Sequence, residues 1–269
     1  MGLCLLLSAC GSSAYSALSP TGSSPLVIAH RGASHEAPEN TIAAYALAIE
    51  QGARLAECDV YLSSDGVPVV FHDAELERTT NGKGAIESKT LAELKELDAG
   101  SWKNSRYAGE RIPTLVEFLC AVKDRLRPVI EIKGSGRGIE AAVIAALREA
   151  EFASEDVMIF SFRLETVAEI ARLDPYLPTT WLVGDPPADP APLRAVLREA
   201  LAARVSALGV SRGDLHSTFL RRAHESGFPV FVWTVNDRDD MVQLAGQGVD
   251  AIITDRPDLA LRIFGGEKE

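Results

Sequence analysis

From residue 25 onward, short apolar runs alternate with segments of helical periodicity, and this rhythm restricts the possible folds more than any other feature. Strand-like runs separated by helices predict βα units and a parallel sheet. Eight units can be counted. The expected strands are 26–30, 54–60, 128–133, 157–162, 179–183, 206–210, 229–235 and 250–254. The expected helices are 41–51, 115–126, 139–150, 164–173, 192–203, 218–225, 238–246 and 257–264.

Eight βα units in a chain of 269 residues fit one (β/α)8 barrel, the TIM barrel, over residues 25–269. This fold carries its catalytic residues at the carboxyl ends of its strands. We therefore expect the polar residues that end the predicted strands to meet at one mouth of the barrel.

The second unit contains a predicted β-hairpin, AECDVYLSSDGVPVVFHD, at residues 56–73. Asp65-Gly66 suits a two-residue turn, because both turn positions need positive φ. The run 67–71 must then be antiparallel, since its link to the preceding strand is too short for a parallel crossover.

With this turn, Asp59 is expected directly opposite His72, and Glu57 lies on the same face of the strand. One hairpin would thus present two carboxylates and an imidazole on one surface. That combination suits a hard divalent cation beside an acid or base.

Residues 74–113 form an insertion that interrupts the βα rhythm. We expect a short helix at 91–97, and capping boxes at Thr90 to Glu93 and at Thr114 to Glu117. Long excursions from a barrel are often lids or specificity elements, although a covering loop without a catalytic role fits the sequence equally well.

Further candidates lie at other strand ends. His30 and Arg31 close the first strand, Glu131 and Lys133 share one face of the third, and Trp233 lies near the end of the seventh. Charged side chains in an apolar strand are rarely buried unless they are paired or bind metal.

Glu57, Asp59 and Glu131 would together form an oxygen site suited to Mg²⁺ or Ca²⁺. Zinc fits poorly, because it prefers nitrogen or sulfur ligands. Each candidate alone has an ordinary structural explanation, such as a salt bridge or a hydrogen-bonded histidine. Their predicted meeting at one mouth is what supports a site.

Other polar and reactive residues are assigned structural roles. Asn40 is expected to cap the first helix, although it could also reach the site from its loop. Cys58 and Cys120 are expected in the core. No catalytic role is expected for three further histidines, His35, His216 and His224.

The first ten residues, MGLCLLLSAC, form an apolar run in which Leu7 to Cys10 resembles the lipobox of bacterial lipoproteins. The run lacks a basic residue and is short for a secretory signal. With a flexible tether over 11–24, it predicts a lipid-anchored protein of the bacterial cell envelope, attached to the membrane only through Cys10. The alternative is an ordinary apolar N-terminus on a cytoplasmic protein.

The charge balance limits the partners. With 27 basic and 38 acidic residues the net charge is −11, which disfavours binding to nucleic acid or to anionic membranes. An anionic substrate would need local cations. The sequence leaves the oligomeric state open.

From residue 27 to residue 257 the sequence resembles the glycerophosphodiester phosphodiesterase family. The likeness is carried by IAHRGASHEAPENT, AECDVYLSSDGVPVVFHD and ERTTNGKG, and continues through IPTL, EIK, SF, WTVN and ITDRP. It implies a barrel phosphodiesterase that produces sn-glycerol 3-phosphate and an alcohol.

The resemblance also implies a role for each candidate. Glu57, Asp59 and Glu131 match the family's metal ligands, and His30 and His72 match its catalytic histidines. Substrate-binding positions are matched by three residues, Arg31, Lys133 and Trp233.

Two other functions remain open. A lysophospholipase D or sphingomyelinase D-like enzyme would act on lipids and needs an apolar rim around the mouth. A catalytically silent lipoprotein would bind metal or glycerol phosphates, but it would not need a pair of acid/base histidines.

Overall fold

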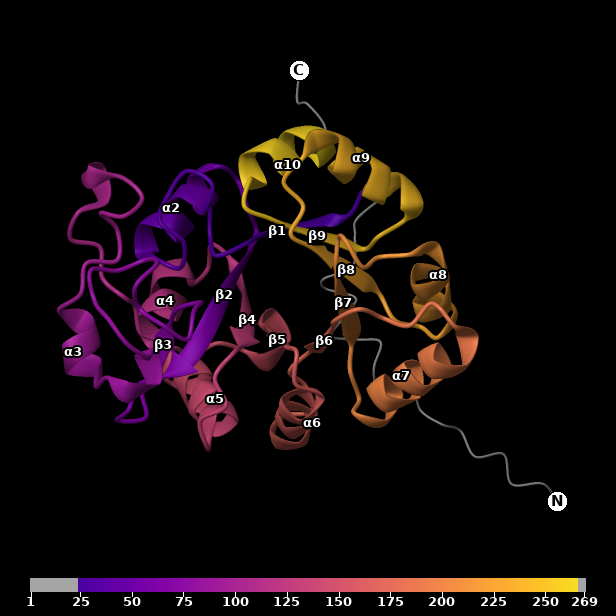
Figure 1. The fold of residues 1–269 in the computed structure, drawn as a ribbon, viewed down its shortest axis with the longest axis horizontal. Helices are drawn as coiled ribbons and strands as arrows, with labels where there is room; N and C mark the ends of the chain where they lie inside the picture. The colour runs from indigo at the N-terminus through magenta and orange to yellow at the C-terminus, as the bar shows by residue number, and fades with distance from the viewer. Residues whose placement is uncertain (1–23, 266–269) are drawn as a thin grey trace.

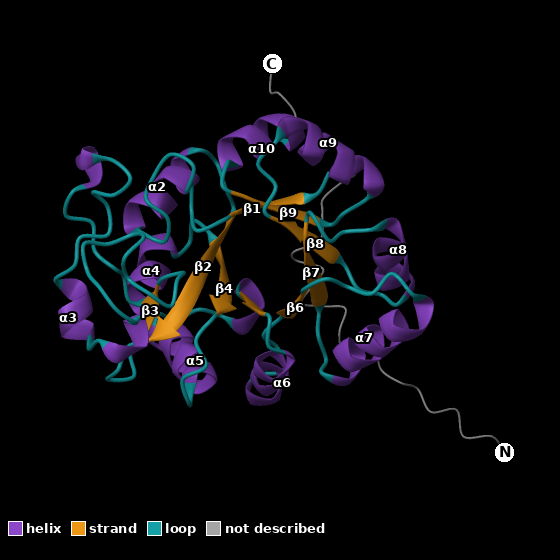
Figure 2. Ribbon diagram, in the orientation of Figure 1, coloured by secondary structure: helices purple, strands orange, loops and turns teal. Residues whose placement is uncertain are grey.

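The computed structural model describes residues 24–265, which form a closed barrel of eight parallel strands with an outer ring of helices (Figures 1 and 2). The sheet order is β1-β9-β8-β7-β6-β5-β4-β2-β3, and pairing between β1 and β2 closes the barrel. The predicted fold is confirmed. The parallel strands are β1 (Leu26–Ala29), β2 (Leu55–Leu62), β4 (Arg127–Ile132), β5 (Met158–Ser161), β6 (Thr179–Val183), β7 (Ala207–Ser211), β8 (Val230–Trp233) and β9 (Ala251–Thr254).

A helix follows each parallel strand and packs on the outside of the barrel (Figure 2). These helices are α2 (Ile42–Glu50), α4 (Leu115–Val122), α5 (Ile139–Glu149), α6 (Leu164–Leu173), α7 (Pro190–Ala202), α8 (Ser217–Glu225), α9 (Arg238–Gln247) and α10 (Pro257–Phe264). A short 3-10 helix, η3 (Ser154–Asp156), precedes β5.

The strands are buried on both faces, which explains why they read as continuous apolar runs. One apolar cluster contains a set of alternate strand residues, including Ile28, Leu55, Val129, Phe160 and Phe231. Two larger clusters join the intervening strand residues to the helices. Cys58 is buried among the latter, as predicted.

The prediction for Cys120 was wrong, because this residue is exposed on α4. The helix buries Leu115, Phe118, Leu119 and Val122. At 3.6 residues per turn, position 120 falls on the face opposite to that stripe.

The hairpin forms, but its predicted register was wrong by one residue. Strand β3 (Pro68–Val70) is antiparallel to β2, and the backbone N–H of Phe71 donates to the carbonyl of Asp59. Asp59 is therefore opposite Phe71, and His72 lies in the loop beyond the strand. The connection contains three residues rather than two, because Ser63 pairs with Val67.

The turn itself explains this difference. The N–H of Gly66 donates to the carbonyl of Ser63, and Gly66 has a φ of +84°. A β-turn followed by a left-handed glycine gives the common three-residue hairpin loop. The Ser63 hydroxyl stabilises it by donating to Asp65 and accepting from the N–H of Val67.

The insertion is an ordered unit that lies beside the hairpin, outside the barrel (Figure 1). It contains η1 (Ile86–Ser88), α3 (Leu91–Lys95) and η2 (Ser105–Tyr107). Both predicted capping boxes are present. A separate apolar cluster attaches the insertion to the hairpin and consists of Val69, Phe71, Leu76, Ile86, Leu94, Ala99 and Ile112.

The predicted lipobox at Cys10 and the tether, apart from Ser24, lie outside the described residues. Within 24–265, no helix has the length and apolar character needed to cross a bilayer.

Candidate active site

A cavity of about 250 Å³ opens at the carboxyl ends of the strands. Polar and apolar residues both line it. The polar members are His30, Arg31, Glu57, His72, Glu131, Lys133 and Thr234, and the apolar members are Phe160, Phe162, Leu182, Trp233 and Ile253. Seven of the eight predicted site residues are in this lining, and the eighth, Asp59, contacts Arg31 and Lys133 beneath it.

Three buried carboxylates form the centre of the site. Glu57 and Asp59 are two residues apart on β2, and Asp59 is paired in register with Glu131 on β4. One oxygen atom from each lies within 4.8 Å of the others. One oxygen of each side chain, Oε1 of Glu57, Oδ1 of Asp59 and Oε1 of Glu131, is buried without a hydrogen-bond partner. Lys133 Nζ forms ion pairs with two of these oxygens, Oε1 of Glu131 and Oδ1 of Asp59, so Oε1 of Glu57 alone of the three has neither a hydrogen bond nor an ion pair. The three oxygens and their spacing fit a divalent cation.

Burial and mutual repulsion affect the protonation of these acids. Burial, together with the charges of Asp59 and Glu131, raises the pKa of Glu57 well above its usual value. Burial and the charge of Asp59 raise the pKa of Glu131 to about 7. A bound cation would reverse this effect, because it favours the charged form of each carboxylate.

Arg31 and Lys133 add positive charge to the same cluster. Arg31 Nε lies 3.2 Å from Asp59 Oδ2, and its backbone N–H donates to Glu57 Oε2 at 2.9 Å. Lys133 Nζ lies 3.3 Å from Glu131 Oε1 and 3.7 Å from Asp59 Oδ1. Although burial opposes ionisation, the surrounding carboxylates raise the pKa of both cations, so both remain charged.

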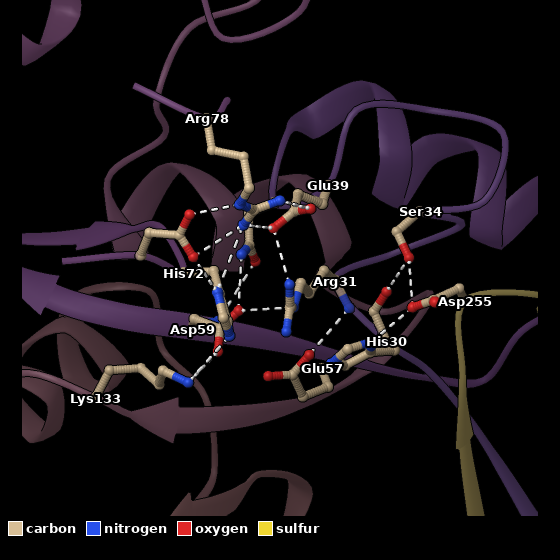
Figure 3. A network of polar contacts seen from close by, with 12 residues as sticks. His30, Arg31, Ser34, Glu39, Glu57, Asp59, His72, Arg78, Lys133 and Asp255 are labelled. Carbon is tan, nitrogen blue, oxygen red and sulfur yellow. Dashed lines mark hydrogen bonds and ion pairs between the residues drawn. The ribbon is translucent and has the colours of Figure 1, made fainter. Parts of the chain in front are cut away.

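His30 is oriented by a carboxylate from the last βα loop. Its Nδ1 lies 2.6 Å from Oδ1 of Asp255, and the same oxygen accepts from the hydroxyl of Ser34 (Figure 3). Oδ2 of Asp255 accepts from Nδ2 of Asn236. Although burial opposes ionisation, these hydrogen bonds lower the pKa of Asp255. The ionised Asp255 carboxylate therefore fixes the orientation of the ring.

His72 is oriented in a similar way, but its surroundings carry more positive charge. Nδ1 lies 2.6 Å from Asp73, and Nε2 lies 3.1 Å from Nζ of Lys133. An ammonium group can only donate, so Nε2 accepts and the proton resides on Nδ1. Burial and the charges of Arg31 and Lys133 lower the pKa of His72, although Asp59 opposes this. The ring is therefore neutral at pH 7.

Aromatic residues supply an apolar part of the cavity. The rings of Phe162 and Trp233 meet edge to face with 5.5 Å between their centroids. Lys133 Nζ lies 6.0 Å from the Phe162 ring. The ammonium group therefore lies between the acid cluster and an aromatic surface.

A model of the glycerophosphoryl diester phosphodiesterase family matches residues 30–259. The chain belongs to this family. It is 39% identical over 243 residues to a glycerophosphodiester phosphodiesterase of Caldanaerobacter subterraneus subsp. tengcongensis, covering 88% of this chain and 97% of that protein. It is 33% identical over 260 residues to one of Bacillus subtilis, covering 90% and 87% respectively.

Solved structures of the family are also similar. An Oleispira antarctica phosphodiesterase, in complex with the product sn-glycerol-3-phosphate, superposes with a TM-score of 0.84 at 32% identity. That match covers 94% of this chain and 99% of the other. A glycerophosphodiester phosphodiesterase of Agrobacterium tumefaciens superposes with a TM-score of 0.75 at 30% identity, covering 88% and 99%.

The structure brings together every residue that the family resemblance selects, and their individual roles stay predictions. One assignment was wrong. Thr41, not Asn40, caps α2, because the Thr41 hydroxyl accepts from the N–H of Ala44. Asn40 is buried and donates from Nδ2 to Asp59 Oδ2 at 2.8 Å, while its Oδ1 accepts from the hydroxyl of Tyr45.

Sequence reasoning also missed the carboxylates that orient the histidines. Asp73 could have been found, since it directly follows His72. Asp255 is the third residue of the ITDRP stretch, but nothing in its spacing relates it to His30, which is 225 residues earlier. The contacts of Glu39 and Arg78 were missed as well.

Proposed function

We propose that this enzyme hydrolyses glycerophosphodiesters to sn-glycerol 3-phosphate and an alcohol, with a divalent metal and histidine acid/base catalysis. One observation supports this proposal most: two imidazoles, each oriented by its own carboxylate, line the same cavity as a three-carboxylate cluster. A protein that only bound glycerol phosphates would not need this arrangement.

Glu57, Asp59 and Glu131 would hold the cation, and their hard oxygen donors suit Mg²⁺ or Ca²⁺. When bound, the cation would neutralise negative charge on the phosphate. Arg31 and Lys133 contribute further positive charge, which the net charge of −11 makes necessary for an anionic substrate.

Proton transfer is assigned from the contacts of the two rings. His72 is neutral with an unprotonated Nε2, so it suits the base that removes a proton from the glycerol hydroxyl next to the phosphate. The hydroxyl oxygen bonds to phosphorus, and the ester bond between phosphorus and the alcohol breaks. The glycerol then carries a cyclic phosphate. His30, whose ring is oriented by Asp255, gives a proton to the departing alcohol oxygen.

Water then opens the cyclic phosphate with the roles exchanged. His30 removes a proton from the water, whose oxygen bonds to phosphorus. The bond between phosphorus and the glycerol oxygen that attacked in the first step breaks, and His72 returns its proton to that oxygen. Both histidines thus regain their starting states, and the products are the alcohol and sn-glycerol 3-phosphate.

The direct test is an assay of glycerophosphocholine and glycerophosphoethanolamine that measures release of sn-glycerol 3-phosphate. We expect turnover with Mg²⁺ or Ca²⁺, none after EDTA, and recovery when metal is restored. The variants Glu57→Gln, Asp59→Asn and Glu131→Gln should each bind metal at least tenfold more weakly by calorimetry, whereas Glu75→Gln, on the exposed surface, should not.

Two outcomes would support the alternatives. Release of choline from lysophosphatidylcholine, without turnover of the water-soluble diesters, would favour a lipid phosphodiesterase. Metal binding without turnover of any substrate would favour a binding lipoprotein and would contradict the proposal.

We also propose that the chain is a lipoprotein of the bacterial cell envelope, anchored through Cys10. The support is the sequence LSAC at residues 7–10 and the Ser- and Gly-rich stretch that follows. Mass spectrometry of the mature protein should find an N-terminal Cys10 carrying acyl groups. A mature protein that retains Met1 and no acyl chain would contradict the anchor.

A further inference from the structure

Arg78 connects the insertion to the active site. Its guanidinium group contacts two carboxylates at once (Figure 3). Nη1 and Nη2 donate to Glu39 at 2.7 and 2.8 Å, while Nε and Nη2 donate to Asp73, the latter at 3.0 Å. One arginine thus makes a two-point contact with each acid.

Each of these acids contacts a residue of the site. Asp73 holds Nδ1 of His72 at 2.6 Å. Glu39 accepts from Nη1 of Arg31 at 2.9 Å, and Arg31 in turn contacts Asp59. Arg78 itself lines no part of the cavity, so it can act only through these partners.

The chemistry of this contact requires an arginine. A guanidinium group presents a rigid planar set of donors, whereas the ammonium of lysine is a single point charge that cannot span two carboxylates. The two acids are largely covered, since the Glu39 and Asp73 side chains are 12% and 26% exposed, whereas the Arg78 side chain is 45% exposed. Without Arg78 the two acids would face each other with Arg31 as the remaining cation beside Glu39.

We propose that Arg78 is a positioning residue that fixes Asp73 to orient His72 and fixes Glu39 to orient Arg31. The inference rests on the proposed phosphodiesterase function. It also answers the question that the sequence left open, because it makes the insertion part of the catalytic apparatus rather than a covering loop.

The test compares Arg78→Met with Arg111→Met. Arg111 is an exposed arginine of the same insertion that donates to the backbone carbonyl of Glu96, so it is a matched control. Loss of an outer-shell partner of this kind costs about 10–100-fold, and we expect Arg78→Met to lower kcat by that factor. KM should rise less than kcat falls, and Arg111→Met should change neither.

A second comparison separates positioning from general stability. If Arg78 acts on kcat through Asp73, then Arg78→Met/Asp73→Asn should have a kcat within about threefold of Asp73→Asn alone. If the two substitutions instead lowered kcat independently, so that their factors multiplied in the double variant, Arg78 would not act through Asp73. Arg78→Lys keeps the charge but not the planar set of donors, so it should recover only part of the lost kcat. Full recovery would show that charge alone is sufficient and would overturn the positioning role.

A spectroscopic readout tests the inference independently of turnover. The Nδ1–H proton of His72 should give a low-field NMR signal that Arg78→Met broadens or shifts and Arg111→Met leaves unchanged. An unaltered signal together with unaltered kcat would overturn the inference.

If the wild-type protein turned over no diester, the proposed function would fail, and this signal would still decide whether Arg78 orients His72. If Arg78→Met does not fold, the signal in Arg78→Lys decides, with a shift supporting the inference.

Discussion

Nζ of Lys133 lies 3.1 Å from Nε2 of His72, so a cation that contacts the acid cluster also contacts the imidazole proposed as the base. This contact disfavours protonation of the ring. It also explains how a histidine next to Asp73 can remain neutral at pH 7. In the proposed mechanism Lys133 would have two effects, since it would supply positive charge for the phosphate and keep His72 available as a base.

The first prediction concerns this contact. Lys133→Met removes a positive charge from beside His72 and leaves Asp59 and Glu131 less neutralised, and both changes favour the imidazolium form. The pKa of His72 should therefore rise. NMR titration of the ring in metal-free protein measures it directly, and Lys123→Met, at an exposed ion pair on the outer surface, is the control. An unchanged or lower pKa would contradict the contact.

The second prediction concerns the histidines themselves. His30→Ala and His72→Ala should each lower kcat by roughly 10²–10⁴-fold, the usual contribution of acid/base catalysis. Both rings are at the barrel mouth rather than in the apolar core, so Tm should change little. His224→Ala, whose ring contacts Asp250 on the outside of the barrel, should keep wild-type turnover. Turnover near the wild-type value in either site variant would defeat the assignment.

The third prediction is a pH dependence of stability. Burial and neighbouring acids raise the folded-state pKa of Glu57 and raise that of Glu131 from 4.5 to about 7. Between these values the two acids bind protons more tightly in the folded protein than in the unfolded chain, so they make metal-free protein lose stability as pH rises through this range. The lowered pKa of His72 acts in the opposite direction below 6.5, but it is one group against two acids.

This trend can be measured by calorimetry after EDTA treatment. Tm should be higher near pH 5 than near pH 8, and saturating Mg²⁺ or Ca²⁺ should restore it at the higher pH. Glu131→Gln cannot ionise at this position and should flatten the dependence. A metal-free Tm that increases from pH 5 to pH 8 would contradict the arrangement.

The fold was predictable because strands buried on both faces give apolar runs that helices must separate. The acid cluster was predictable because Glu57 and Asp59 share a strand face, and Glu131 is a charge in an apolar strand. The hairpin register was not, since a left-handed Gly66 suits a two-residue and a three-residue loop equally. The hydrogen bonds of the Ser63 hydroxyl distinguish the two, and they are visible only in three dimensions.

For Asn40 the sequence favoured a helix cap over the alternative that it reaches the site, and the structure confirms the alternative. Capping preference could not distinguish Asn40 from its neighbour Thr41, because both residue types are good caps. The structure separates them, since Asn40 has a φ of +59° and points its side chain at Asp59. Its Oδ1 accepts from the hydroxyl of Tyr45, so the amide orientation is fixed by a buried partner.

The last prediction follows from this contact. Asn40→Ala removes the donor to Asp59 Oδ2 and leaves the Tyr45 hydroxyl without its acceptor, so the carboxylate loses its fixed orientation toward the cation. Metal affinity should fall by about 10–100-fold, as for other outer-shell partners. Calorimetric titration with Mg²⁺ and Ca²⁺ measures the loss. Thr41→Ala removes the true cap and should lower Tm with little effect on metal affinity, whereas equal metal affinity in both variants would show that Asn40 does not position Asp59.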